Sequence, residues 1–119
     1  MEVHPVSPAA YLRIERGDVI GVNVSAITMD DATATIERWI REGRREYVCI
    51  TGVHGVMECR RDPLLREIHN QAGMVTPDGV PLVYFLRLIG RKRAQRVYGP
   101  DLMREMTAVS ARHGYRQFY

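Results

Sequence analysis

The chain has 119 residues, of which 45% are hydrophobic and 26% are charged, and this suits one globular domain with a single core. The net charge of +3 is too mild to indicate a partner by itself. Two cysteines without motif spacing argue against a disulfide scaffold or a zinc site and suit a reducing cytoplasm. The sequence shows neither a signal-peptide pattern nor an apolar run near the ~20 residues of a membrane span.

The first third of the chain predicts a leader, a strand region and a helix. Residues 1–17 have little periodicity and are expected to form a loose leader before a domain over 18–119. Residues 18–27 alternate and are rich in β-branched side chains, which predicts a strand or a hairpin arm around Gly21. Thr28 is a predicted N-cap, with Asp31 as its capping-box partner, and Gly43 is expected to end that helix.

The middle of the chain predicts a buried strand followed by two helices. Residues 47–51 form a short apolar run of the kind that is buried in parallel sheets. Residues 52–55 (GVHG) then predict a turn, with a helix starting near Val56. The backbone N–H groups that this turn leaves exposed at the helix start favour anions. A G-x-x-G segment after a strand is also common in turns that bind no ligand. Asp62 is expected to cap a second helix, which Pro63 would open.

Residues 74–89 form a predicted strand–turn–helix unit around which the rest of the chain is organised. The strand 74–76 leads into a bend at Asp78, and the apolar stretch 80–89 predicts a helix that is buried on most sides. The bend lies at the carboxyl end of a strand, where open α/β sheets bind ligands. Asp78 can be an N-cap, which spacing alone favours, or a catalytic carboxylate, while Gly79 allows a close approach of the backbone.

The last third of the chain begins with a basic run over residues 87–96, which is either a solvated loop or a site for phosphates or anionic lipid head groups. A turn at residues 98–101 is followed by a helix that ends near Gly114, and residues 115–119 read as the start of another strand. Strand and helix patterns alternate throughout, which predicts a layered α/β fold with a largely parallel sheet.

Three segments carry a resemblance to a known family. In order and spacing they are similar to motifs of the WecG/TagA/CpsF family of bacterial glycosyltransferases, and the resemblance covers residues 18–119. The segments are residues 51–58 (TGVHGVME) followed by Arg61, Asp62 and Pro63; residues 76–83 (TPDGVPLV); and residues 96–103 (RVYGPDLM).

The resemblance implies an inverting enzyme with a Rossmann-like α/β core. Such enzymes move a sugar, often N-acetylmannosamine, from a UDP-sugar to a polyprenyl-diphosphate-linked sugar at the inner face of the cell membrane. Their products feed teichoic acid, capsule or exopolysaccharide synthesis. The chain is therefore expected to be cytoplasmic, peripheral at the inner membrane, and the N-terminal half of a longer enzyme.

The same resemblance assigns roles to individual residues. Asp78 matches the proposed general base, Thr51 a threonine of the substrate pocket, and Arg96 an arginine that binds or stabilises substrate. The family often has asparagine where this chain has Val53, so either His54 or Thr51 alone is expected to make that polar contact instead. His54 and Gly79 are both predicted substrate-binding residues. The chain has no Asp-x-Asp motif, so neither a metal nor another cofactor is predicted.

Two other classes of function remain open from the residues alone. The basic run could serve a nucleotide- or nucleic-acid-binding module, but no aromatic residues interleave with its arginines as a base-stacking surface requires. Nucleic acid is therefore not a predicted partner. An oligomerising fragment is the third possibility, because an exposed final strand offers an unpaired edge for a second copy.

Overall fold

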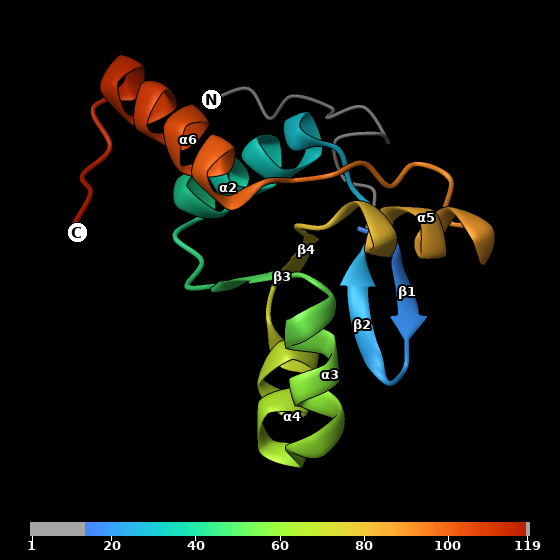
Figure 1. Ribbon diagram of the computed structural model, residues 1–119. Coiled ribbons are helices and arrows are strands. Elements are labelled where there is room, and N and C mark those ends of the chain that lie inside the picture. Colours follow the sequence, from blue (N-terminus) through green and yellow to red (C-terminus); the bar gives the residue numbers. More distant parts are fainter. Residues whose placement is uncertain (1–13, 119) are drawn as a thin grey trace.

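The computed structural model of the protein describes residues 14–118 (Figure 1). The predicted leader lies mostly outside this range, and its last two residues begin the first strand. The elements in chain order are β1 (Arg16–Val19), β2 (Val22–Ser25), α2 (Met29–Glu42), β3 (Val48–Thr51), α3 (Val53–Arg61), α4 (Pro63–Gln71), β4 (Met74–Pro77), α5 (Val80–Leu88) and α6 (Gly99–His113).

The first two strands form the hairpin that the alternation around Gly21 predicts. They pair antiparallel, with Arg16 opposite Ser25 and Val19 opposite Val22. Ile20 and Gly21 make the connection with φ angles of 51° and 88°. A two-residue loop with positive φ at both positions matches the right-handed twist of the strands, so this turn fixes the hairpin register.

The other two strands form a parallel pair. Val48 lies opposite Met74, and Thr51 lies opposite Pro77, so both strands end at the same edge. The mixed α/β class is thus confirmed, but within residues 14–118 the strands form only these two pairs rather than the largely parallel sheet that was predicted. The strand 47–51 is also less buried than predicted: Thr51 is 2% exposed, whereas Ile50 on the opposite face is 47% exposed.

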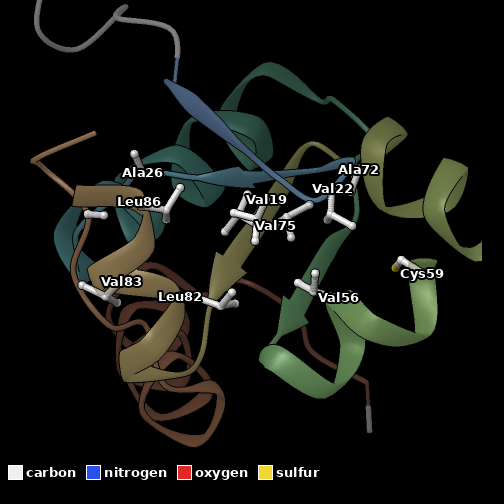
Figure 2. Close-up of a cluster of buried hydrophobic side chains, with 12 residues drawn as sticks. Val19, Val22, Ala26, Val56, Cys59, Ala72, Val75, Leu82, Val83 and Leu86 are labelled. Carbon is white, nitrogen blue, oxygen red and sulfur yellow. The ribbon is translucent and has the colours of Figure 1, made fainter. Parts of the chain in front are cut away.

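Strand β4 is buried on both faces and separates two apolar clusters. Val75 belongs to the first cluster, where the hairpin, α3 and α5 meet (Figure 2). Met74 belongs to the second, which includes Trp39 of α2 and residues of α6. Because side chains alternate along a strand, this one strand supplies both cores.

Helices α2 and α6 lie side by side and cover the second cluster (Figure 1). The capping box that was predicted at the start of α2 is present: Asp31 N–H donates to Thr28 Oγ1, and Thr28 N–H donates to the Asp31 carboxylate. The αL residues Gly43 and Gly114 end α2 and α6, as the sequence predicts.

Helix α5 packs on the hairpin with only one face. Leu82, Val83 and Leu86 are buried, whereas Tyr84 is 64% exposed and Leu88 is 83% exposed. The prediction that this helix is buried on most sides is therefore wrong, because its high apolar content does not report which faces the rest of the chain covers. No helix in the described range is long and apolar enough to cross a membrane.

Two further boundaries differ from the sequence predictions. Helix α3 begins at Val53 rather than near Val56, so the second glycine of the GVHG segment lies within the helix. Residues 115–118 form no strand; instead Tyr115 packs against the second cluster. For Tyr115, tertiary packing overrides the local strand pattern.

Candidate functional site

Three segments of backbone converge beyond the carboxyl ends of β3 and β4. The Asp78 N–H donates to the carbonyl of Thr51 over 2.9 Å, which joins the two strand ends. The Val97 N–H donates to the carbonyl of Pro77, also over 2.9 Å, which brings the segment after α5 alongside. These two main-chain hydrogen bonds bring together three residues that were predicted for the site: Thr51, Asp78 and Arg96, the last of which precedes Val97.

The Asp78 carboxylate does not cap a helix. Gly79 is the N-cap of α5, with φ −116° and ψ 145°, and the cap position has no side-chain hydrogen bond. The Asp78 Oδ1 atom is buried and has no hydrogen-bond partner among the described residues. The capping role that spacing alone favours is therefore wrong, and the carboxylate remains available for other chemistry.

Arg96 is held beside this carboxylate by its own hydrogen bond. Its Nε donates to the Asp78 carbonyl over 2.7 Å, and its guanidinium carbon lies 4.5 Å from the centre of the Tyr98 ring. Its Nη2 lies 3.9 Å from Asp78 Oδ1, which is an ion pair but too long for a hydrogen bond. The Arg96 side chain is half exposed, so part of the guanidinium can still meet an anion from solvent.

Thr51 is oriented into the protein rather than towards solvent. Its Oγ1 lies 2.9 Å from Nε2 of His69, a buried residue of α4. The structure thus gives this hydroxyl an interior partner, and the substrate-binding role of Thr51 stays a prediction. The sequence analysis missed His69, although it lies four residues after Leu65 and therefore on the same face of α4.

His54 and Gly79 differ in their relation to the carboxylate. The His54 side chain is 90% exposed and lies 3.9 Å from Glu58 Oε1, one turn further along α3, so the structure does not bring it to Asp78. A Cβ atom on Gly79 would lie 4.0 Å from the Cα of Gly52. These two glycines are the N-caps of α5 and α3, so two helix N-termini without side-chain caps lie next to each other.

The basic run does not form one anion site. Arg87 donates to the Ala94 carbonyl, and Arg91 donates to the Arg16 carbonyl. Arg93 makes two hydrogen bonds of 2.7 Å to the Asp31 carboxylate, and these lower the pKa of Asp31. The run is thus shared among several structural contacts, and only Arg96 of the run reaches Asp78.

The two cysteines and the acidic residues do not suggest a metal centre. Burial raises the pKa of the Cys49 and Cys59 thiols, so both remain protonated near neutral pH. Across residues 14–118, no three His, Cys, Asp or Glu side chains come together as metal ligands.

A free carboxylate beside an arginine, where two parallel strands end, is the kind of arrangement with which enzymes move protons and stabilise anions. Comparison with models of known families matches residues 17–119 to the glycosyl transferase WecG/TagA/CpsF family. The match covers most of the chain, so the chain belongs to this family and is a glycosyltransferase. A comparison with curated proteins found no match.

Proposed function

We propose that this enzyme is an inverting glycosyltransferase that moves a sugar from a UDP-sugar to a polyprenyl-diphosphate-linked sugar, with Asp78 as the general base. N-acetylmannosamine or a related hexose is the proposed donor sugar. The observation that carries the proposal is the Asp78 carboxylate itself, which caps no helix and whose Oδ1 has no hydrogen-bond partner in the described chain. Family membership supports the transfer of a glycosyl group.

In the proposed reaction, an acceptor hydroxyl attacks the anomeric carbon of the donor sugar. A neutral hydroxyl is a poor nucleophile, so the Asp78 carboxylate takes its proton as the new carbon–oxygen bond forms. The bond between the anomeric carbon and the diphosphate breaks, and UDP leaves with the electron pair. Attack from the face opposite the leaving group inverts the anomeric configuration.

The negative charge that develops on the diphosphate needs donors close to Asp78. Arg96 is one, because its guanidinium is held beside Asp78 and is partly open to solvent. The adjacent N-termini of α3 and α5 offer uncapped backbone N–H groups, which favour phosphate oxygens. Gly79 has no side chain to block this approach, and the exposed His54 on the first turn of α3 is available to the same substrate.

A lipid-linked acceptor requires an approach to the membrane surface, and α5 offers a suitable face next to the site. Tyr84, Leu88 and Ile89 are exposed apolar residues on this helix or at its end. Arg87 and Lys92, which lie within or just after the same helix, are exposed cations. An apolar face flanked by cations suits the anionic inner face of a bacterial membrane.

We also propose a wider context for this domain. The β3–β4 pair would be part of a Rossmann-like sheet to which further chain contributes, because Ile50 of β3 remains exposed although parallel strands are normally covered. The product would enter a cell-surface polymer such as teichoic acid or exopolysaccharide. Truncating the exposed Ile50 side chain of β3 to alanine should then destabilise a longer chain more than residues 1–119 alone.

The decisive experiment measures UDP release from candidate UDP-sugars, with and without a lipid-linked N-acetylglucosamine acceptor. Wild-type protein should release UDP in an acceptor-dependent manner, and Asp78→Asn should lose at least about 100-fold in kcat, as expected for a missing general base. Asp30→Asn removes an exposed carboxylate at the start of α2 and serves as the matched control.

Two outcomes would contradict this proposal. Equal rates for wild type and folded Asp78→Asn would exclude Asp78 as the base. A product that retains the anomeric configuration would exclude the direct displacement.

The same UDP-release assay tests whether α5 approaches the membrane. The Leu88→Glu variant should keep the wild-type rate with a soluble acceptor and should be slower than wild type with an acceptor embedded in anionic vesicles.

A further inference from the structure

A buried pair of polar side chains, Thr51 and His69, is linked to the backbone of the proposed base by the hydrogen bond from the Asp78 N–H to the Thr51 carbonyl. Thr51 is 2% exposed and His69 is 9% exposed, and the distance from Thr51 Oγ1 to His69 Nε2 is 2.9 Å. The hydrogen bond joins the last residue of β3 to helix α4. A buried polar pair of this kind fixes the relative placement of the two elements that carry it.

The second ring nitrogen of His69 determines the direction of this hydrogen bond. Nδ1 lies 3.1 Å from the Leu65 carbonyl oxygen, which can only accept, so Nδ1 carries the hydrogen. In a neutral imidazole, Nε2 is then the acceptor, and the Thr51 hydroxyl donates to it. The hydroxyl proton of Thr51 is therefore already used within the protein.

The other side of Thr51 is also confined. A Cβ atom on Gly55 would lie 3.0 Å from the Thr51 methyl group, so a larger residue at position 55 would press on this methyl. With its methyl against Gly55 and its hydroxyl on His69, Thr51 has one favourable rotamer. The end of β3 is thus held from two directions by side-chain contacts.

What Thr51 holds in turn is the backbone of the proposed base. Its carbonyl accepts the hydrogen bond from the Asp78 N–H at 2.9 Å. An unbroken chain of contacts therefore runs from the Leu65 carbonyl through the His69 ring and Thr51 to the main chain of Asp78. A displacement of Thr51 would move Asp78 and, with it, the Arg96 side chain that bonds to the Asp78 carbonyl.

We propose that His69 is a positioning residue that fixes the proposed base Asp78 through Thr51. It would touch neither donor nor acceptor, and it would set the geometry from which the carboxylate takes its proton. The catalytic part of this inference rests on the proposed function of Asp78, whereas the structural part does not. Small misplacements of a catalytic group are costly, because the reacting atoms must start close together and aligned.

The first experiment measures kcat and KM for His69→Leu, which fills similar space without an acceptor nitrogen. We expect kcat to fall about 10-fold or more while KM for the UDP-sugar changes less than about threefold. His69→Gln returns an acceptor and should recover most of the rate, and His113→Leu, an exposed histidine of α6, is the control. Unchanged kcat in folded His69→Leu, alongside a lower kcat in Asp78→Asn, would overturn the positioning role and leave the base intact.

A double-mutant cycle tests whether His69 acts through Thr51. Thr51→Val removes the hydroxyl, and adding His69→Leu to it should cost little more than either change alone, because both break the same contact. If the loss of kcat in the double variant equals the product of the losses in the two single variants, His69 does not act through Thr51.

A second measurement needs no turnover. In wild-type protein, NMR of the His69 ring should show hydrogen on Nδ1 and none on Nε2. In His69→Leu, hydrogen exchange of the Asp78 amide should become about 10-fold faster, while the Val24 amide in the hairpin should be unaffected. Equal protection of the Asp78 amide in both proteins would overturn the proposal whatever the activity assay shows.

Discussion

Two aspartates that precede helices in this enzyme have opposite fates. Asp62 is followed directly by Pro63 and caps α4, because its Oδ1 accepts hydrogen bonds from Leu64 N–H and Leu65 N–H at 3.1 and 3.2 Å. Asp78 is separated from α5 by Gly79, which takes the N-cap position itself. A single inserted residue thus converts a structural carboxylate into one that is free to act on a substrate.

The comparison predicts that removing the Asp62 carboxylate lowers stability, whereas removing the Asp78 carboxylate lowers activity. Asp62→Ala should lower the free energy of unfolding by about 1 kcal/mol, because it leaves two helix N–H groups without their cap. Asp78→Ala should change the free energy of unfolding by less than about 0.5 kcal/mol, because its carboxylate makes no cap and only a long ion pair.

Chemical denaturation of the two variants beside wild type measures this contrast. Asp62→Ala should also keep its glycosyl transfer, since Asp62 lies at the far end of α3 from the proposed base. A loss of stability in Asp78→Ala as large as in Asp62→Ala would mean that the Asp78 carboxylate has a structural role after all.

A third aspartate, Asp31, extends the comparison, because its contribution to stability is expected to depend on pH. Hydrogen bonds from Arg93 lower its pKa below the ordinary value of 3.8, so the folded state favours the charged form. Its contribution to stability is complete above the unfolded pKa and is lost as pH falls through the folded pKa. Asp31→Asn should therefore be less stable than wild type at neutral pH, and the difference should narrow below about pH 4.

Thermal unfolding of wild type and Asp31→Asn at stepped pH values measures that difference. Asp30→Asn, on the same first turn of α2, is the control and should show no such narrowing. A difference between wild type and Asp31→Asn that stays constant down to acid pH would show that the charge of Asp31 contributes nothing.

The smallest expected effect comes from giving α5 the cap that it lacks. Gly79 has an extended backbone that any residue adopts, and a Cβ atom there would meet Pro81 at an ordinary 3.6 Å. Gly79→Ser should therefore raise the free energy of unfolding by a few tenths of a kcal/mol. Urea denaturation measures the gain, and a loss of stability would mean that the space beside Gly52 is tighter than the distances indicate.

Local signals in the sequence were enough to predict much of the secondary structure. The hairpin around Gly21, the capping box of Thr28 and Asp31, and the cap at Asp62 are set by residues near to one another in the chain, so spacing reveals them. The exposure of Leu88 could not be predicted in this way, because composition reports that α5 is apolar and not which of its faces is covered.

The site was only partly predictable, because its geometry depends on contacts between residues that are far apart in the chain. The motifs indicated Asp78 and Arg96, but their closeness depends on a main-chain bond from Val97 to Pro77, which lie twenty residues apart. The orientation of Thr51 depends on His69, and α4 carries that histidine into the interior. The spacing of four residues between Leu65 and His69 indicated that His69 is buried, but it did not indicate that Thr51 is its hydrogen-bond partner.

The double burial of β4 has a consequence for how this domain comes apart. Met74 and Val75 point into different cores, so neither core can open without exposing part of the strand on which the other is built. We therefore expect a loss of packing in one cluster to weaken the other as well. Because Asp78 directly follows this strand, the position of its carboxylate depends on the packing of both cores.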